Sequence, residues 1–308
     1  MSKIAVIGSF VMDLVGLVDE FPLEGQTVIG NAFHTMPGGK GANQAVAAAR
    51  LGANVEMFGR VGNDAYGEMF LNLFREEGID TSTVKKLDEY PTAVGLIQIN
   101  RHAENKIVVI PGANFGYLTE DADRDSVRYL SADFAVLQLE LEQTVTYEII
   151  KKCEATGIPV MLNPAPAVRI PNDILSKVTY LTPNETELEI LTGMKVDTHD
   201  EVKAAVDVLL DMGVKNVIAT LGKRGAYIGN AEMSTFIQGY EVDPVDTVAA
   251  GDSFNGALAY GLSIGNTLTE AVKYANAVGA LTVTKQGAIP SLPTANEVEH
   301  FLKVKASR

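Results

Sequence analysis

A carboxylate near the end of the chain has the surroundings that proton abstraction requires. In "DTVAAGDSFNGALAYGL" (246–262), Asp252 follows three small residues, Ala249, Ala250 and Gly251. Apolar residues then recur at helical spacing, so we expect a buried helix from about Gly251. The first N–H groups of a helix lack intrahelical acceptors and lie at the positive end of its dipole. The segment therefore predicts an anion hole beside a carboxylate.

Two interpretations of Asp252 follow from this position. As a general base, it would take the proton from an attacking hydroxyl while the neighbouring amides hold a transferred phosphoryl group, as phosphoryl transfer requires. As a purely structural residue, it would only favour the start of a helix, because acidic side chains stabilise the first turn.

A second segment, "PGGKGANQAVAAARLG" (37–52), opens an Ala-rich helix with a tight glycine turn. Its glycines permit close approach of the backbone to a ligand, and Lys40 and Asn43 supply hydrogen-bond donors. It is not a Walker P-loop, because Lys40 precedes Gly41 rather than Ser or Thr. The first strand also lacks the G-x-G-x-x-G spacing that dinucleotide binding needs. A structural turn without a ligand remains the alternative.

Two shorter segments have the residue types of a nucleotide site. In "TPNETE", Asn184 and Glu187 are three residues apart on one helix face, where they would order Mg²⁺-bound water around phosphates. The same pair also suits a helix cap. The segment "TLGKRGAY" (220–227) reads as strand, glycine turn and strand, and either wraps a nucleotide or forms a plain hairpin.

The elements that position these residues follow two different sequence patterns. From about Asp133 onward, short apolar runs alternate with helical stretches, which predicts an α/β fold with a parallel-core sheet flanked by helices on both faces. Its sites should lie at the carboxyl ends of the strands. The earlier strands lack helices of their own, and we expect a small β-sheet lid from about 14–36 and 92–110, inserted in a single domain of 1–308. Edge strands of the main sheet are the alternative.

Composition excludes several classes of protein. The chain has 308 residues, 46% hydrophobic and 21% charged, so it has enough apolar residues for a large core. Its net charge of −14 disfavours nucleic acid as a partner. No apolar run is long enough for a membrane span, and the single cysteine, Cys153, fits a reducing compartment. We expect a soluble cytoplasmic protein. The four histidines lack the spacing of metal ligands.

Taken together, these segments resemble the ribokinase (PfkB-type) family of carbohydrate kinases. The two glycine-rich segments are similar to the signature regions of that family, and "NPAPA", "TPNETE", "TLGKRG" and "KQGAIPS" follow in the expected order. Because "GGKGANQA" and "LNPAPA" look like the pentose-kinase versions, the chain is most similar to ribokinase and 2-deoxyribokinase.

The resemblance implies a fold, a reaction and cofactors. It implies transfer of the γ-phosphoryl group of ATP to the 5-hydroxyl of ribose or 2-deoxyribose, with Mg²⁺ and a monovalent cation such as K⁺. Asp252 would be the base, and Ala249, Ala250 and Gly251 the anion hole. The implied sugar-binding residues are Asp13, Gly38, Gly39, Lys40, Asn43 and Glu140, together with Asp252. On this basis we expect Asp13 at the carboxyl end of the first strand, facing the glycine turn at Gly38 and Gly39.

It also implies nucleotide and metal positions. The nucleotide-binding residues would be Asn184, Thr220, Gly222, Lys223, Gly225, Gly251 and Asn276, with Glu187 linked to Mg²⁺ through water. The K⁺ positions would be Asp246, Val248, Thr282, Lys285, Gly287 and Ser291. The lid would close over the sugar and pair with the lid of a second subunit, giving a homodimer.

One position departs from the ribokinase pattern. Ribokinases usually carry Asn two residues before the sugar-binding Asp, whereas this chain has Val11 before Asp13. An apolar residue there favours a sugar that lacks the 2-hydroxyl, and 2-deoxyribose is the preferred substrate on this reasoning. The alternatives are a kinase for another furanose such as fructose or for a nucleoside, and a non-catalytic sugar or nucleotide sensor. The missing glycine fingerprint disfavours a nicotinamide-dependent oxidoreductase.

Overall fold

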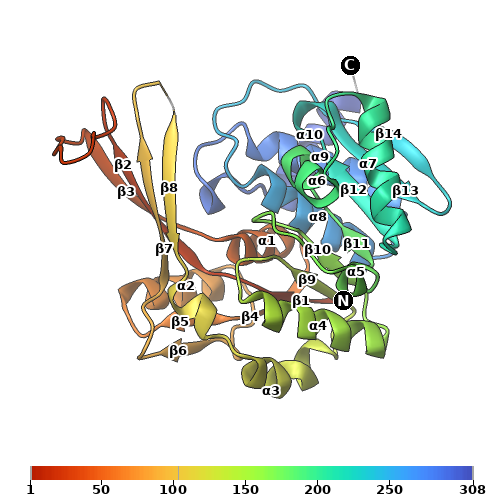
Figure 1. Cartoon of the computed structure of the whole chain (residues 1–308), viewed down its shortest axis with the longest axis horizontal. Helices are drawn as coiled ribbons and strands as arrows, with labels where there is room; N and C mark the ends of the chain where they lie inside the picture. The colour runs from red at the N-terminus through yellow and green to blue at the C-terminus, as the bar shows by residue number, and fades with distance from the viewer. Residues whose placement is uncertain (1, 103, 307–308) are drawn as a thin grey trace.

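The computed structural model describes residues 2–102 and 104–306, and an eight-stranded sheet crosses its main part (Figure 1). The strand order is β14-β13-β12-β11-β10-β9-β1-β4. Neighbouring strands from β4 to β12 are parallel, and β13 and β14 continue the sheet as antiparallel strands. The strands are β1 (Lys3–Ile7), β4 (Asn54–Phe58), β9 (Phe134–Leu137), β10 (Val160–Leu162), β11 (Tyr180–Leu181), β12 (Asn216–Thr220), β13 (Gly225–Asn230) and β14 (Ser234–Gln238).

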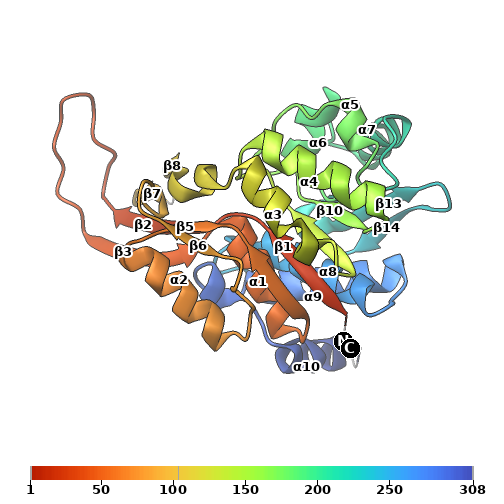
Figure 2. The same cartoon turned by 90° about the horizontal axis from the view of Figure 1, so that it is seen from below.

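Helices cover both faces of this sheet, and Figure 2 shows the two layers on opposite sides. One layer contains α1 (Lys40–Arg50), α2 (Ala65–Glu76), α8 (Ala250–Ser263), α9 (Leu268–Thr282) and α10 (Ala295–Ala306). The other contains α3 (Thr119–Tyr129), α4 (Gln143–Thr156), α5 (Asn172–Leu175), α6 (Glu185–Thr192) and α7 (His199–Asp211).

The core explains why the strands read as continuous apolar runs. In β1, Ile4 and Val6 pack into the core on the α1–α8 side, whereas Ala5 and Ile7 pack into the core on the α4–α7 side. All four side chains are fully buried. Alternate residues point to opposite faces, so a strand covered on both faces needs apolar residues throughout. The predicted α/β architecture is confirmed.

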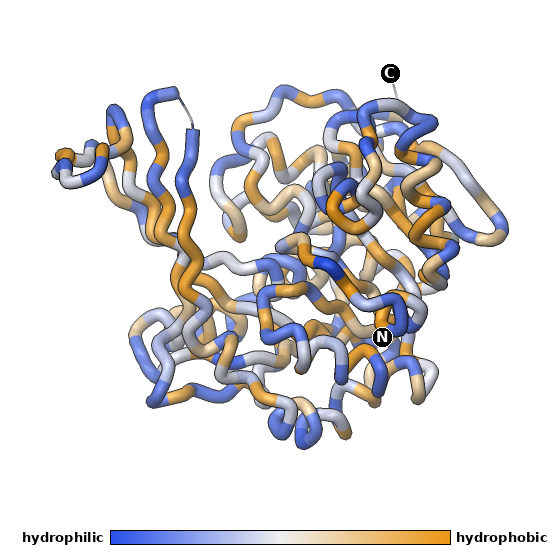
Figure 3. Tube along the Cα trace, in the orientation of Figure 1, coloured by the Kyte–Doolittle hydropathy of each residue, from blue (hydrophilic) through white to orange (hydrophobic). Residues whose placement is uncertain are grey.

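A separate four-stranded sheet, named the lid here after the prediction for this segment, projects from this core (Figure 1). Its strand order is β3-β2-β7-β8. The strands are β2 (Val11–Leu17), β3 (Ala32–Gly38), β7 (Ala93–Ile99) and β8 (Asn105–Ile110). Figure 3 shows apolar segments that continue from the main domain into these strands.

The first lid strand corrects the position expected for Asp13. The carboxylate was expected at the carboxyl end of the first strand, but β1 ends at Ile7 and Asp13 lies inside β2. There it pairs with Met36 of β3 and Gly95 of β7. The apolar residues around it belong to a second strand that starts at Val11, only four residues after the first one ends.

The remaining elements are small. Strands β5 (Arg60–Gly62) and β6 (Lys85–Leu87) form a parallel pair. Short 3₁₀ turns occur at Gly112–Gly116, Gly222–Arg224 and Ile289–Ser291. Within residues 2–102 and 104–306, none of the helices has both the length and the apolar character to cross a bilayer.

Candidate active site

The start of α8 lies at the centre of the candidate site. Ala249 precedes this helix with a φ of 60°, and among the described residues it is the one non-glycine residue with a positive φ. A left-handed alanine costs conformational energy, and such strain concentrates at functional sites. The helix begins at Ala250, one residue before the predicted start, and Asp252 in its first turn is only 8% exposed.

Two amides of α1 hold the Asp252 carboxylate. Asn43 donates from Nδ2 to Oδ2 at 2.8 Å, and Gln44 donates from Nε2 to Oδ1 at 3.0 Å. The glycine-rich turn therefore places α1 directly against the first turn of α8. Close packing of the two helices depends on Gly256, because a Cβ there would lie 2.7 Å from the Gln44 carbonyl oxygen.

The first turn of α1 is fixed by a second carboxylate. Glu140 accepts hydrogen bonds from the Lys40 backbone N–H at 2.9 Å and from the Ser9 hydroxyl. The Ser9 Oγ in turn accepts from the Gly41 N–H at 3.2 Å. A Cβ on Gly41 would lie 2.3 Å from the Ser9 nitrogen, so only glycine permits this approach. An acidic group at a helix N-terminus is stabilised by the free amides there.

Glycines make room for Asp13 on both neighbouring strands. A Cβ on Gly38 would lie 2.7 Å from one carboxylate oxygen of Asp13, and a Cβ on Gly95 would lie 2.7 Å from the other. Gly38 was expected here, whereas Gly95 was not. A glycine inside an apolar strand, as in "TAVGLIQIN", signals such close approach.

Burial and neighbouring charges shift the pKa values of Asp13, Glu187 and Lys40 in the site. Burial raises the pKa of Asp13 to about 6, with Glu140 and Asp252 adding to the rise and Lys40 opposing it. Burial also raises the pKa of Glu187. For Lys40, burial alone would lower the pKa, but the four carboxylates outweigh it and raise the pKa. Lys40 is therefore a cation at neutral pH inside an acidic cluster.

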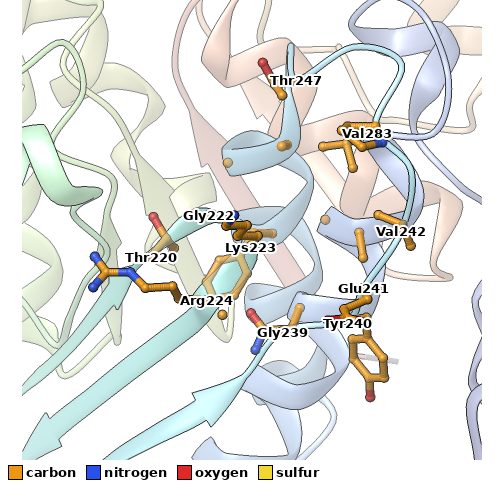
Figure 4. A pocket seen from close by; sticks show the side chains of 18 of the residues that line it. Thr220, Gly222, Lys223, Arg224, Gly239, Tyr240, Glu241, Val242, Thr247 and Val283 are labelled. Carbon is orange, nitrogen blue, oxygen red and sulfur yellow. The ribbon is translucent and has the colours of Figure 1, made fainter. Parts of the chain in front are cut away.

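Two cavities meet at the start of α8. The larger, of about 890 Å³, is bounded by the β12–β13 turn, the loop 239–247 and α9 (Figure 4). The smaller, of about 180 Å³, is lined by Lys40, Glu187 and Asp252, among others. Both contain Thr247, Ala250 and Gly251 in their walls. A molecule that reaches from one cavity to the other must pass the amides of α8.

The segments predicted to bind a nucleotide lie in the walls of these two cavities. Thr220, Gly222, Lys223, Gly225 and Asn276 line the larger cavity. The stretch 220–227 does form an antiparallel hairpin, and its turn is part of the cavity wall. The predicted hairpin is therefore present, and nucleotide binding by its turn stays a prediction.

Asn184 lines the smaller cavity instead and forms a capping box with Glu187. The Asn184 Nδ2 donates to Glu187 Oε1 at 3.0 Å, and the Glu187 N–H donates to Asn184 Oδ1 at 2.8 Å. The pair therefore caps α6, as the helix-cap interpretation predicts, and both residues also line the smaller cavity. A β-bridge to Thr220 connects Asn184 to the wall of the larger cavity.

Comparison with known proteins assigns the family. The family model described as "pfkB family carbohydrate kinase" matches residues 1–295. The chain belongs to the pfkB family of carbohydrate kinases. The predicted resemblance and the predicted enzyme class, a sugar kinase, are therefore confirmed.

The relatives of this kinase match it over almost its whole length. A ribokinase of Haemophilus influenzae is 38% identical over 301 residues, covering 97% of this chain and 98% of the relative. A deoxyribokinase of Salmonella typhimurium is 38% identical over 302 residues, covering 98% and 99%. The structure of an Arabidopsis thaliana ribokinase complexed with ribose and ATP superposes with a TM-score of 0.91 at 30% identity, covering 98% and 99%.

The residues expected around a monovalent cation lie in two adjoining segments of this kinase, the loop before α8 and the stretch from the end of α9 to the 3₁₀ turn at Ile289–Ser291. The Asp246 carboxylate accepts from the Val248 N–H at 3.0 Å and from the Gly287 N–H at 2.9 Å. Side chains at the other positions are engaged elsewhere: Thr282 Oγ1 donates to Val278, Ser291 Oγ to Ala288, and Lys285 Nζ to Glu297. The Asp246 carboxylate and the backbone carbonyls of these segments are oxygen atoms of the kind that bind such a cation.

Ser9, Gln44 and Gly95 are among the site residues that sequence reasoning missed. Gln44 directly follows Asn43, but its consecutive position on the helix gave no signal that both side chains reach one carboxylate. Ser9 follows a strand-ending glycine in "IGSF", where a small polar residue is ordinary.

Proposed function

We propose that this kinase transfers the γ-phosphoryl group of MgATP to the 5-hydroxyl of a free pentose, either ribose or 2-deoxyribose. The observation that carries the proposal is the start of α8, which lines both cavities and carries Asp252 in the smaller one. The names of the relatives, ribokinase and deoxyribokinase, support the pentose. The ribose and ATP in the Arabidopsis complex support both substrates.

In this proposal Asp252 is the general base. Its carboxylate accepts the proton of the sugar hydroxyl as that oxygen attacks the γ-phosphorus, while the bond from this phosphorus to the β–γ bridging oxygen breaks and ADP leaves. The backbone N–H groups at the start of α8 face the phosphoryl group in transfer and stabilise its negative charge. Lys40, which stays protonated in the smaller cavity, adds a positive charge there.

The larger cavity is proposed to take the nucleotide. Its volume of about 890 Å³ lies within the usual range for small-molecule sites. Lys223 at the β12–β13 turn supplies a positive charge in the wall, and Asn276 lies across the cavity on α9. The lid sheet is proposed to close over the sugar, which would exclude water from ATP.

Magnesium is proposed to enter with the phosphates. Across residues 2–102 and 104–306, no group of three or more His, Cys, Asp or Glu side chains is arranged to bind a metal ion. Glu187 faces the smaller cavity, and its carboxylate suits water-mediated contact with Mg²⁺. The ion would neutralise charge on the transferred phosphoryl group.

A monovalent cation is proposed beside the anion hole. The carbonyl oxygens of the loops 245–248 and 282–291, with the Asp246 carboxylate, are of the oxygen type that hard cations take. A cation there would order the loop that leads into α8. Activity in K⁺ compared with a buffer containing only a bulky organic cation tests this, and equal rates would contradict it.

Val11 is the proposed discriminator between the two pentoses. Its side chain is 5% exposed and shares a face of β2 with Asp13. A Cβ on Gly95 would lie 3.7 Å from Val11 Cγ1 and 2.7 Å from Asp13, so an apolar group adjoins the sugar-binding carboxylate. Such a surface cannot donate to a 2-hydroxyl, but it rejects an added hydroxyl by only about 100-fold at most.

A sugar panel with MgATP and K⁺ tests the substrate. We expect phosphorylation of both pentoses, with a higher kcat/KM for 2-deoxyribose, and a shift toward ribose in Val11→Asn. A tenfold or greater preference of the native enzyme for ribose would contradict the role given to Val11. Turnover only with fructose or a nucleoside would contradict the pentose.

Replacing Asp252 tests the chemical role. We expect Asp252→Asn to lower kcat by about 100- to 10,000-fold, the usual contribution of general base catalysis. Thermal unfolding of the variant checks that the fold is intact. Near-normal turnover in a folded variant would show that Asp252 is not the base.

A further inference from the structure

A buried chain of amides stands behind the Asp252 carboxylate. Gln44 is fully buried, Gln138 is 1% exposed and Asn163 is 7% exposed. Gln138 donates from Nε2 to Gln44 Oε1 at 2.8 Å, and Gln44 donates from Nε2 both to Asp252 at 3.0 Å and to Asn163 Oδ1 at 3.2 Å. Buried polar side chains are costly unless they are paired.

The carboxylate determines the direction of these hydrogen bonds. An ionised Asp252 only accepts, so Gln44 must turn its Nε2 toward it. The Gln44 Oε1 then faces Gln138, which supplies an N–H. Both N–H groups and the oxygen of the Gln44 amide are thereby used, and its side chain has one satisfied orientation.

Three neighbouring strands anchor this chain of amides. Gln138 directly follows β9, and Asn163 directly follows β10. Asn163 also donates from Nδ2 to the Thr182 carbonyl at 3.3 Å, just after β11. Adjacent parallel strands in a buried sheet are among the most rigid parts of a protein. The orientation of Gln44 is therefore tied to the central sheet.

Packing at Gly8 completes the support. A Cβ on Gly8 would lie 2.1 Å from the Gln138 Oε1, so the main chain after β1 lies directly against that amide. This oxygen is buried and has no hydrogen-bond partner among the described residues. A buried acceptor without a hydrogen-bond partner lowers the stability of the fold. The amide orientation that leaves this oxygen unpaired is the one that lets the Gln138 N–H donate to Gln44.

We propose that Gln44 is a positioning residue for phosphoryl transfer, and that Gln138 and Asn163 fix its orientation. The inference rests on the proposed role of Asp252 as the base. Gln44 holds one carboxylate oxygen by a hydrogen bond, while Asn43 holds the other. The plane of the carboxylate is thereby set before a sugar binds, so that its remaining lone pairs face the attacking hydroxyl.

A double-mutant cycle with Gln44→Met and Asp252→Asn tests the inference. Methionine keeps the length and most of the volume of glutamine and removes the donor. We expect Gln44→Met to lower kcat about 10- to 100-fold with KM for ATP and for the sugar within about twofold, because misplacement of a reacting group affects the chemical step. In the Asp252→Asn background, Gln44→Met should lower kcat little further, since both changes disable the same function.

Two further variants complete the test. Gln138→Met leaves Gln44 in place, and we expect a smaller fall in kcat, about three- to tenfold, again with KM unchanged. Thr146→Val is the matched control, because Thr146 is fully buried on α4, where its Oγ1 donates to Glu142 at 3.4 Å. This control should leave kcat unchanged. If Gln44→Met does not fold, the Gln138→Met result decides: an unchanged kcat overturns the proposal.

The outcomes separate this inference from the proposed function. If Asp252→Asn abolishes turnover while Gln44→Met keeps kcat within twofold, the positioning role is wrong and the base stands. If the two losses multiply in the double variant, Gln44 acts independently of Asp252 and the positioning role is wrong. If Asp252→Asn itself keeps turnover, the assignment of the base fails.

Discussion

Strand β1 of the main sheet and strand β8 of the lid are both short apolar runs, yet they differ in exposure. In β1, Ile4 and its three apolar neighbours are completely buried. In β8, every residue is exposed, with Ile107 at 54% and Val108 at 60%. Helices cover both faces of the main sheet at β1, whereas β8 is an edge strand whose only strand neighbour in its sheet is β7.

The difference teaches that an apolar strand is not by itself evidence of a core. The lid exposes apolar side chains on both faces, because Ile107 and Val108 are consecutive in β8 and point to opposite sides. Exposed apolar surface of this kind marks a region available for a ligand or a partner. We therefore propose that the lid serves in closure over the sugar and in pairing with a second copy of the chain.

The same substitution in the two sheets gives the largest expected contrast. We expect Ile4→Ala to reduce the free energy of unfolding by about 2–5 kcal/mol, because it leaves a cavity in a packed core. Ile107→Ala should change it by less than about 0.5 kcal/mol. Denaturant unfolding of both variants at low protein concentration measures this. Equal losses would show that the outer strand of the lid is covered in solution.

Asp13 sharpens the comparison, because it is a charged residue at the base of the lid. Its pKa of about 6 lies above the ordinary value of 3.8, so the folded protein binds more protons than the unfolded chain between these pH values. Stability from this group is full at low pH and falls as pH rises to about 6. We expect Asp13→Asn to stabilise the fold above pH 6 by up to about 3 kcal/mol, since each pKa unit corresponds to about 1.4 kcal/mol.

Thermal unfolding of native and Asp13→Asn protein from pH 4 to pH 8 measures this effect. The difference in melting temperature should be small at pH 4 and grow until about pH 6. The variant should also lose affinity for the sugar, so that stability and function change in opposite directions. A variant that is less stable at pH 8 would contradict the burial effect assigned to Asp13.

The smallest expected effect on stability comes from the outer face of the lid. Val108 pairs with Leu96, on the face of the sheet opposite Asp13. We expect Val108→Lys to leave the melting temperature of dilute protein within about 2 °C, because a mostly exposed side chain contributes little. If two lids pair, the variant should shift the mass in sedimentation from dimer toward monomer. A native protein that is already monomeric would contradict the proposed pairing.

Much of the candidate site follows from local sequence because its parts begin elements. The start of α8, the glycine turn before α1 and the cap of α6 each combine a turn signal with an apolar helical pattern. Helix starts present free amides wherever they occur, so a candidate anion hole can be proposed from small residues at a helix start alone. The alternation of buried strands and helices likewise indicated which ends of the strands would carry the site.

Other parts depend on contacts between distant segments. Gln44 and Gln138 are 94 residues apart, and Gln44 and Asp252 are 208 apart. A single sequence contains no signal for such pairings between buried amides. The position of Asp13 failed for a different reason: β2 starts so soon after β1 that one apolar run covers two strands in two different sheets.

The sequence by itself determined the class of fold, the family pattern and the turns that expose backbone amides, because these depend on periodicity and on residues next to one another. Only the tertiary structure decided which apolar strands are buried, since burial depends on what other elements cover. It also decided that Asp252 lies between two amides of α1, because close packing at Gly256 brings the two helices together. Orientation of a carboxylate depends on its distant neighbours, and these are set by the packing of the whole chain.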